Sequence, residues 1–325
     1  MAKLETIYVT GGSGYLGRNI IRQFVSKGHS ILALARSDAS ASIVASLGAT
    51  PVLGDILDEA SLSKGMIGAD WVIHAAADTA HGMAEMRQHQ SNLEGTKNVF
   101  VAAKLAGVQR AIHISTEAVL VAGKPLINVN ESMPIPKRHA GGYSQSKAAA
   151  ELMAISLTST EMPIIILRPR FVWGRDDTTA LPQLVAAARS GKLKWIDGGH
   201  YLTSTTHIDN VVEGIRLALE KGRGGEAYFI TDGKPVEFRH FVSQMLNASG
   251  TKPSNSEIPR WLCEIVIFVG SLAEKLTAGK FTSPLSMQEY GTVGMEVTLD
   301  ISKAQSELGY RPIISIESGL KSIVT

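Results

Sequence analysis

The feature that most constrains the fold is a glycine-rich turn between a short apolar segment and an amphipathic segment. The apolar segment covers residues 7–10, and the turn over residues 10–17 reads Thr-Gly-Gly-Ser-Gly-Tyr-Leu-Gly. Apolar residues then recur at helical spacing, so the pattern predicts a strand, a tight turn and a helix. Gly11 permits the turn, Gly14 lets a ligand approach the backbone, and Gly17 lets the helix pack closely on the strand.

This turn favours a dinucleotide site in which the pyrophosphate lies at the N-terminus of the helix. The spacing is GxxGxxG rather than the commoner GxGxxG, and a glycine-rich turn without a ligand is the alternative interpretation. The strand before the turn and the helix after it are the context that a dinucleotide motif requires.

Short β-rich segments alternate with amphipathic segments along the first half of the chain. Strand patterns follow at 31–35, 51–53, 71–75, 111–115 and 164–167, and helical patterns at 58–66, 85–106 and 143–158. This alternation predicts an α/β fold with a Rossmann-type, doubly wound parallel sheet. We expect residues 1–169 plus about 205–230 to form an NADP-binding domain. The remainder, about 170–204 plus 231–325, should form a smaller, mostly helical C-terminal substrate lobe.

Composition excludes several classes of protein. The chain has 325 residues, a formal net charge of +2 and one cysteine, Cys263. Balanced charge without a basic run argues against a nucleic-acid partner. The single cysteine excludes an internal disulfide framework and fits a reducing compartment, and no Cys/His cluster suggests a metal site. Because no cationic segment followed by an apolar run opens the chain, we expect a cytoplasmic protein.

The residues after the second and third strand patterns bear on the choice of cofactor. Arg36 follows the segment 31–35 directly. An arginine here accommodates a 2′-phosphate, whereas an acidic residue would bind a ribose 2′-hydroxyl. We therefore expect NADP(H) in preference to NAD(H), with an ordinary surface arginine near Asp38 as the alternative. Asp55 follows the third strand, where it would lie at the adenine edge or cap a helix.

A second motif, YSQSK at residues 143–147, carries acid–base groups. Tyr143 and Lys147 are four residues apart and share one helix face. An ammonium group stabilises a phenolate and makes the phenol a usable proton donor near neutral pH. Such pairs also occur on solvated helix faces, but here the pair follows a nucleotide loop and a Ser-Thr step at the end of a later strand.

These motifs belong to a longer resemblance that covers nearly the whole chain. The matching segments are TGGSGYLG (10–17), GDILD (54–58), IHAAA (73–77), NLEGTKNV (92–99), ISTEAV (114–119), YSQSK (143–147), LRPRFVWGRDD (167–177), THIDNVVEG (206–214), AYFITDGKPVEF (227–238) and LDISKAQSELGYRP (299–312). In these segments the chain resembles the extended short-chain dehydrogenases/reductases of the NAD-dependent epimerase/dehydratase superfamily, and among them the 3β-hydroxysteroid dehydrogenase-like branch. The resemblance implies a Rossmann-type fold and NAD(P)-linked interconversion of alcohols and ketones.

The resemblance also implies roles for individual residues. Tyr143 would donate and accept the substrate proton, and Lys147 would bind the nicotinamide ribose and lower the pKa of the tyrosine. Thr116 falls where the family usually has its catalytic hydroxyl, with Ser115 as the alternative. Asn92 would hold a water or a backbone group behind the site, or cap a helix. The expected cofactor contacts are Gly11, Ser13, Gly14, Tyr15, Leu16, Gly17, Arg36, Asp55, Ile56, Ala75, Ala76, Ala77, Tyr143, Lys147, Pro169, Phe171 and Val172.

Several large apolar residues, with few clustered charges that would bind a diphosphate, favour an apolar substrate that is steroid-like, long-chain or aromatic. The candidates, for which core packing is the alternative, are Met83, Met86, Trp173, Trp195, Trp261 and Met287. The apolar stretch 261–272 contains Glu264 and is shorter than the ~20 residues that a spanning helix needs. We expect a buried or lid helix there, with peripheral membrane contact as the alternative.

Four other polar residues have simpler interpretations. His74 and His113 lie inside strand patterns, where we expect satisfied core histidines. Asp176 and Asp177 have no third ligand at suitable spacing, so we expect a loop turn and no metal site.

The sequence therefore predicts an NADP-dependent oxidoreductase that interconverts a ketone and a secondary alcohol on an apolar small molecule. A nucleotide-sugar epimerase or dehydratase with retained NAD is the alternative, because Arg168, Arg170 and Arg175 could bind a diphosphate. A non-catalytic NADP-binding regulator is a third possibility, disfavoured because both Tyr143 and Lys147 are present. The resemblance also implies a homodimer.

Overall fold

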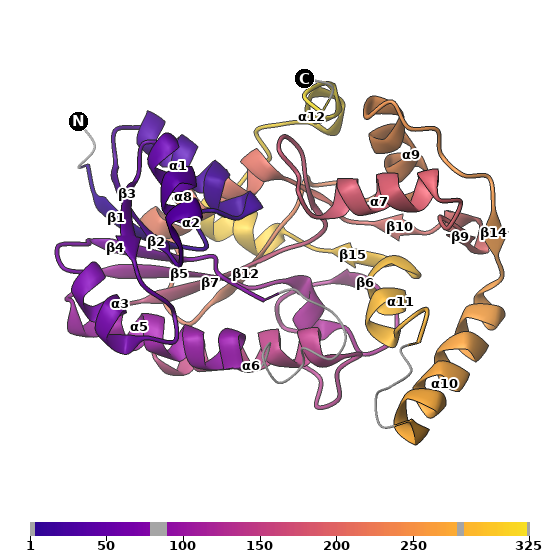
Figure 1. Cartoon of the computed structure of the whole chain (residues 1–325), viewed down its shortest axis with the longest axis horizontal. Coiled ribbons are helices and arrows are strands. Elements are labelled where there is room, and N and C mark those ends of the chain that lie inside the picture. Colours follow the sequence, from indigo (N-terminus) through magenta and orange to yellow (C-terminus); the bar gives the residue numbers. More distant parts are fainter. Residues whose placement is uncertain (1–3, 79–89, 278–282, 324–325) are drawn as a thin grey trace.

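A seven-stranded parallel sheet forms the centre of the computed structural model, which describes residues 4–78, 90–277 and 283–323. The strand order is β12-β7-β5-β4-β1-β2-β3 (Figure 1). The strands are β1 Thr6–Thr10, β2 Ser30–Ala35, β3 Thr50–Leu53, β4 Trp71–His74, β5 Arg110–Ile114, β7 Ile164–Pro169 and β12 Ala227–Ile230. This order confirms the predicted Rossmann-type, doubly wound sheet.

Helices cover both faces of this sheet, which explains why a strand such as β7 is apolar along most of its length and fully buried. One face is covered by α1 Tyr15–Ser26, α2 Asp38–Ser46 and α8 Ile208–Lys221. The other is covered by α3 Glu59–Gly65, α5 Gly95–Leu105 and α6 Gly142–Ser156 (Figure 1). A π-helical turn, Gln90–Glu94, leads into α5. The predicted helix 85–106 is thus described from Gln90, and Met83 and Met86 lie outside the described residues.

A second, smaller lobe combines short strands with helices. Its four-stranded sheet has the order β13-β10-β15-β6, with β13 Val236–Glu237, β10 Leu202–Thr203, β15 Val297–Leu299 and β6 Leu126–Val129. Two further strand pairs are β8 Val172–Trp173 with β11 Thr206–His207, and β9 Trp195–Ile196 with β14 Glu257–Ile258. The helices are α7 Ala180–Arg189, α9 Phe238–Ala248, α10 Arg260–Leu276, α11 Met287–Val293 and α12 Ile316–Lys321.

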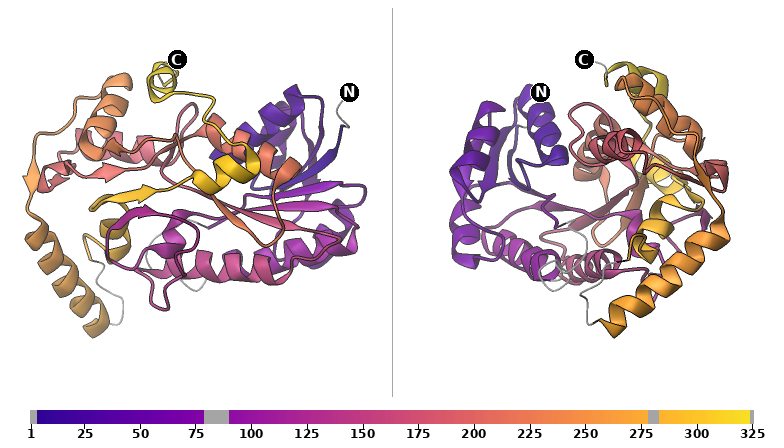
Figure 2. Two further views of the ribbon diagram at one scale, coloured as in Figure 1. Left: turned by 180° about the vertical axis from the view of Figure 1, so that it is seen from behind. Right: turned by 45° about the vertical axis from the view of Figure 1, so that its right-hand side comes forward.

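The apolar stretch 261–272 lies in α10, at the outer end of this lobe in both views of Figure 2. Its inward face packs through Cys263 and Ile267, whereas Trp261 and Phe268 on the outward face are exposed. The expectation of a buried helix is therefore wrong for half of its surface, because apolar residues occupy both faces of α10 and only one face meets the lobe. Among the described helices, none is long and apolar enough to cross a membrane.

Candidate active site

The glycine turn forms a close-fitting cradle between β1 and α1. Gly11 has a φ of +72°, and a Cβ atom there would lie 2.7 Å from the Ala76 backbone nitrogen. A Cβ atom on Gly17 would overlap the Gly11 carbonyl oxygen, so only glycine permits this approach of helix to turn. α1 begins after Gly14 with no side-chain cap on its free N–H groups. The backbone therefore fits an anionic pyrophosphate, and Ser13, Tyr15 and Leu16 belong to the same turn.

Small residues follow β4 beside this cradle. The Thr10 hydroxyl hydrogen-bonds His74 Nδ1 at 2.7 Å and accepts from the Ala76 N–H at 3.2 Å. Ala75 and Ala76 thereby lie next to Gly11, and Ala77 continues the segment at the surface. The carboxyl ends of β1 and β4 are where this fold binds its ligands.

Arg36, Asp55 and Ile56 follow β2 and β3 at the same edge of the sheet. Arg36 is exposed directly after β2. The Asp55 carboxylate accepts from the Leu57 N–H at 2.9 Å, and the helix cap of α3 is Asp58 instead. Asp55 therefore caps the turn before the helix.

The predicted acid–base pair lies on α6, which packs on the main sheet. Lys147 is buried, and its ammonium group donates to the Ile114 carbonyl at 2.8 Å. Burial lowers the pKa of Lys147 to about 8, against the opposing charge of Glu151. For Tyr143, burial and then the Glu117 carboxylate raise the pKa, and a hydrogen bond with Thr116 lowers it. The pKa of Tyr143 is therefore raised, whereas we expected Lys147 to lower it. The reason is that desolvation of the buried phenol is the largest effect.

Two neighbouring hydroxyls at the end of β5 point to different partners. Ser115 donates to the Glu151 carboxylate at 2.5 Å, behind the site. Thr116 is the N-cap of a 3₁₀ turn, Glu117–Leu120, and its hydroxyl donates to Glu117 at 2.7 Å. Because Thr116 also hydrogen-bonds Tyr143, the geometry favours Thr116 over Ser115 as the site hydroxyl. Its catalytic role stays a prediction.

Asn92 lies in the π-helical turn and holds backbone beside the site. Its side-chain oxygen accepts from the Asp78 N–H at 2.8 Å, and its amide donates to the Asp78 carbonyl at 3.1 Å and to the Ser146 hydroxyl at 3.0 Å. Asn92 therefore connects the segment after β4 to α6.

Two buried ion pairs lie beside the site residues Tyr143 and Lys147, and the sequence patterns did not identify them. Arg168 pairs with Glu151, and Arg170 donates to Glu117 at 2.5 Å. Arg170 also donates to the Thr292 carbonyl of α11 at 2.7 Å. Glu151 lies one helical turn after Lys147, a spacing that could have signalled its place on the same face. The pairing of Glu117 with Arg170 spans 53 residues and leaves no local pattern.

The segment after β7 passes from the site into the second lobe. Pro169 ends β7, and Phe171 has a φ of +41°. The Phe171 ring meets the Phe241 ring at 5.8 Å between centroids, in the core of the lobe. Val172 begins β8. Trp173 and Trp195 are fully buried in this core and donate to Asp232 and the Ser254 carbonyl, so they are core residues.

The two histidines inside strands, His74 and His113, differ in their hydrogen bonding. His74 hydrogen-bonds Thr10 and Thr96, and burial lowers its pKa to about 3. The two ring nitrogens of His113 have no hydrogen-bond partner among the described residues. The expectation of a satisfied core histidine therefore fits His74, and it is wrong for His113.

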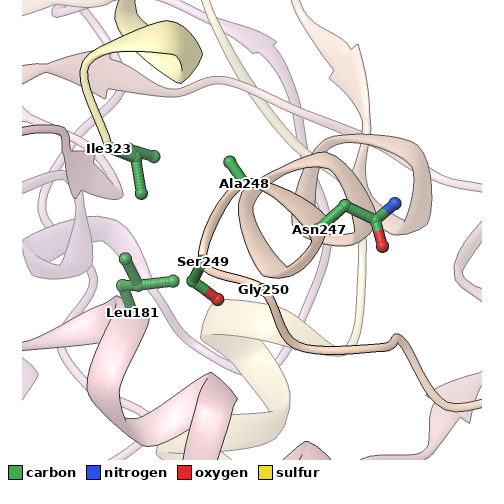
Figure 3. A pocket seen from close by; sticks show the side chains of 6 residues that line it. All are labelled: Leu181, Asn247, Ala248, Ser249, Gly250 and Ile323. Atoms are coloured by element: carbon green, nitrogen blue, oxygen red, sulfur yellow. The ribbon is translucent and has the colours of Figure 1, made fainter. Parts of the chain in front are cut away.

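A depression of about 600 Å³ lies elsewhere in the second lobe (Figure 3). It is lined by Leu181, Asn247, Ala248, Ser249, Gly250 and Ile323. Neither the glycine turn nor Tyr143 borders it. The candidate active site is therefore the carboxyl edge of the main sheet, where the predicted residues meet.

Comparison with known proteins shows the family to which the chain belongs. Residues 8–260 match the 3-beta hydroxysteroid dehydrogenase/isomerase family. The chain is 43% identical to the 4-hydroxy-2-methyl-3-oxo-4-farnesyl-3,4-dihydroquinoline-1-oxide ketoreductase of Stigmatella aurantiaca, over 97% of this chain and 95% of that protein. It is 30% identical to the decarboxylating sterol-4-alpha-carboxylate 3-dehydrogenase of Dictyostelium discoideum, over 98% and 100% of the two chains.

Solved structures show the same fold. The crystal structure of gox2253 superposes with a TM-score of 0.80 at 26% identity, covering 98% of this chain and 97% of the other. UDP-glucose 4-epimerase from Thermotoga maritima superposes with a TM-score of 0.77, covering 98% and 97% of the chains, but at 20% identity it shows the fold alone. The family match extends from β1 to the start of α10, and the chain therefore belongs to the 3-beta hydroxysteroid dehydrogenase/isomerase family.

Proposed function

We propose that the protein is an NADP-dependent oxidoreductase that interconverts a ketone and a secondary alcohol on an apolar small molecule. The observation that carries this proposal is the hydrogen bond between Tyr143 and Thr116, with Lys147 one turn further along α6 and bonded to the end of β5. The names of two relatives support the substrate class, since one is a ketoreductase of a farnesyl-bearing compound and the other a sterol dehydrogenase.

The chemistry follows from these side chains. A bound nicotinamide coenzyme would supply or take up the hydride. In ketone reduction, Tyr143 donates its phenol proton to the substrate oxygen, and Thr116 orients the phenol by a hydrogen bond. The nearby Lys147 ammonium stabilises the phenolate that remains. In alcohol oxidation the phenolate removes the hydroxyl proton. Burial and Glu117 keep the pKa of Tyr143 high, so at neutral pH the tyrosine is in its proton-donating form.

The choice of coenzyme rests on Arg36. Its exposed guanidinium follows β2, where it offers a fork of donors to a 2′-phosphate. The capping hydroxyls of Ser37 and Ser40 begin α2 directly after it. We propose NADP(H) as the coenzyme on this basis.

The buried ion pairs argue against a nucleotide-sugar epimerase or dehydratase. A diphosphate needs accessible basic groups, but Arg168 and Arg170 are each buried and paired with a glutamate. Arg175 alone of the three is exposed, 3.9 Å from Asp209. The epimerase-like structures share the fold at low identity and add no support for that reaction.

The mechanism is tested by Tyr143→Phe with an apolar ketone, for example a steroid 3-ketone, and NADPH. Loss of a positioned proton donor should lower kcat by about 10²–10⁴-fold while the affinity for NADPH stays nearly unchanged. Tyr228→Phe is the matched control, because that hydroxyl bonds Glu307 away from the site. A Tyr143→Phe enzyme with full activity would overturn the proposed mechanism.

The coenzyme is tested separately. Freshly purified protein is denatured, any released nicotinamide is identified by mass spectrometry, and apo protein is titrated with NADPH and NADH. Exchangeable coenzyme with NADPH preference, weakened selectively by Arg36→Ala, supports the reductase. Stoichiometric, tightly retained NAD would instead favour the epimerase.

We also propose a homodimer formed through α5 and α6. Leu105 on α5 and Leu152 on α6 are exposed apolar residues on these helices. Light scattering after size-exclusion chromatography should give twice the mass of the chain, and Leu152→Glu should shift it toward monomer. A monomeric wild-type protein at micromolar concentration would refute the dimer.

A further inference from the structure

The two adjacent hydroxyls that follow β5 each donate to a buried glutamate, and each glutamate pairs with a buried arginine on or directly after β7, the neighbouring strand. The two rows are Ser115 with Glu151 and Arg168, and Thr116 with Glu117 and Arg170. The first row lies behind the site, whereas the second is hydrogen-bonded to Tyr143 through its hydroxyl. The second row is therefore part of the surroundings of the phenol.

The hydrogen bonds of the Thr116 hydroxyl fix the direction of its contact with Tyr143. A hydroxyl has one proton and two lone pairs. One lone pair accepts from the Ala118 N–H at 3.2 Å, and the proton is donated to the Glu117 carboxylate at 2.7 Å. The hydrogen bond with Tyr143 uses the lone pair that remains, so the phenol is the donor. While Glu117 accepts the Thr116 proton, Thr116 has no proton for a phenolate.

The position of the Glu117 carboxylate is fixed by Arg170. The Arg170 Nη1 donates to the other Glu117 oxygen at 2.5 Å, and Nη2 donates to the Thr203 hydroxyl at 3.0 Å and the Thr292 carbonyl at 2.7 Å. Glu117 is 3% exposed and Arg170 1%, so neither side chain has room to turn toward water. Because Thr203 lies in β10 and Thr292 in α11, the second lobe holds the carboxylate in place.

The stability of the fold does not by itself require this ion pair. Desolvation of two buried charges offsets most of their attraction, and apolar residues of the same volume often stabilise a protein as well or better. What Glu117 supplies, and apolar packing would not, is a negative charge beside the phenol. Burial and then this charge raise the pKa of Tyr143, and the hydrogen bond with Thr116 lowers it.

We propose that Glu117, held by Arg170, is a positioning residue that takes the Thr116 hydroxyl proton and thereby keeps Tyr143 in its proton-donating form. In ketone reduction the phenol proton passes to the substrate oxygen. The Thr116 hydroxyl then turns from Glu117 to the new phenolate, and Glu117 itself gains no proton. The catalytic consequence rests on the proposed function, whereas the direction of the hydrogen bonds does not.

The charged groups around Tyr143 come from three elements. Glu117 belongs to the 3₁₀ turn, Arg170 to the segment after β7, and Lys147 to α6, one turn beyond Tyr143. The neighbouring helix α11 meets this end of α6 with the neutral Gln288, which accepts from a backbone N–H there at 3.3 Å. Among the described residues, Glu117 is therefore the negative charge that acts on the phenol.

Glu117→Gln should reverse the direction of these hydrogen bonds. The amide oxygen would face the Arg170 guanidinium, so the amide N–H group would donate to the Thr116 hydroxyl. That hydroxyl would then donate its own proton to the Tyr143 oxygen. Because a phenolate would gain a donor and lose a neighbouring negative charge, the midpoint of the Tyr143 titration should fall by at least about one pH unit.

The first experiment needs no substrate. Fluorine NMR follows the full-length, coenzyme-free protein with a difluorinated tyrosine in place of Tyr143. Ring fluorines lower the pKa of a phenol and bring its titration toward the range in which the protein stays folded. Glu151→Gln is the matched control, because Glu151 is an equally buried glutamate with a hydroxyl and an arginine as partners. The Glu151 charge raises the pKa of Lys147, so its removal should leave the Tyr143 midpoint unchanged or raise it.

A third variant, Glu117→Asp, separates the charge from the fit. Glu117→Asp and Glu117→Gln both disturb the contact with Arg170, so urea unfolding should show a loss of stability in both. Only Glu117→Gln removes the charge, so Glu117→Asp should keep the midpoint at or above the wild-type value. An unchanged midpoint in Glu117→Gln, a lowered one in Glu117→Asp, or an equal fall in Glu151→Gln would each overturn the proposal. Glu117→Asp and Glu151→Gln decide the question even where Glu117→Gln does not fold.

The pH dependence of alcohol oxidation extends the test to the reaction, with natural tyrosine at position 143. The kcat/KM for oxidation rises as the phenolate forms, so the pH of half-maximal kcat/KM should fall in Glu117→Gln and not in Glu151→Gln. A purely structural role would lower kcat/KM at every pH and leave that midpoint in place, which would refute a role in the reaction. Absence of turnover with any ketone or alcohol would refute the proposed function, whereas the NMR midpoints would still decide the role of Glu117.

Discussion

At the scale of single residues, Ser115 and Thr116 show how adjacent hydroxyls acquire different roles. Thr116 hydrogen-bonds Tyr143, so Thr116→Ala should lower kcat by about a hundredfold. Ser115 donates to the buried Glu151, so Ser115→Ala should leave kcat within about twofold and lower the free energy of unfolding by about 1.5–3 kcal/mol. Steady-state kinetics and urea unfolding separate the two effects. A loss of kcat in Ser115→Ala with an unaffected Thr116→Ala would contradict this assignment.

His113 supplies a second prediction at this scale, on stability. Burial, then the charges of Lys147 and His74, hold its pKa well below the usual value, so His113 is neutral in the folded protein. The unfolded chain takes up a proton below about pH 6.5, so stability is lost as the pH falls through that value. His113→Leu leaves no partner unsatisfied. It should raise the free energy of unfolding by about 1–3 kcal/mol at pH 7 and by more at pH 5.

Urea unfolding at the two pH values measures this gain. The exposed His240 provides the control, and His240→Leu should change the free energy of unfolding by less than about 0.5 kcal/mol at either pH. Some loss in acid should remain in His113→Leu, because His74 also has a lowered pKa. A destabilised His113→Leu protein would show that the His113 ring makes a hydrogen bond in solution.

At the scale of secondary-structure elements, the ion pair between Glu151 and Arg168 connects α6 with β7. Glu151 is fully buried and accepts from the Arg168 Nε at 3.0 Å. Glu151→Gln leaves the buried guanidinium without a charged partner, so the free energy of unfolding should fall by about 3–5 kcal/mol. The partly exposed pair of Glu226 with Lys303 is the control, and Glu226→Gln should lose about 0.2–1 kcal/mol. Equal losses in urea unfolding would mean that the buried pair adds no special stability.

The elements also show what could be predicted from the sequence. The central sheet was predictable because each strand is a short apolar run between turn residues, and the glycine turn has a local geometric cause. The strands of the second sheet are two to four residues long and pair across distant parts of the chain, as β6 does with β15. The burial of α10 could not be predicted, because its apolar pattern is the same whether one face or both faces pack against the rest of the protein. The pair of Glu117 with Arg170 exists only after folding.

At the scale of the whole molecule, the C-terminal segment returns to the main sheet and joins the two lobes. Residues after β15 enter the main core through Ile301, Leu308 and Tyr310, and the Tyr310 hydroxyl donates to the Thr231 carbonyl at 2.9 Å. Asn210 of α8 accepts from the N–H of Ile314 at 2.9 Å. Because these last segments pack on the core of the main sheet, we expect the lobes to unfold as one cooperative unit, in which a single free energy of unfolding can be measured.

The buried Lys147 should make that free energy depend on alkaline pH. Its pKa is lowered from 10.5 to about 8 by burial, so between these values the unfolded chain binds a proton that the folded protein does not. Stability contributed by this group therefore rises with pH from about 8 toward 10, by at most about 1.4 kcal/mol per pH unit. Lys147→Met removes the proton uptake, and its unfolding free energy should lack this rise. Cys263, whose pKa is raised by burial, acts in the opposite direction in both proteins, so the difference between the two urea titrations isolates Lys147. Parallel titrations would mean that Lys147 keeps its ordinary pKa in the folded protein and remains charged throughout the range in which the enzyme would work.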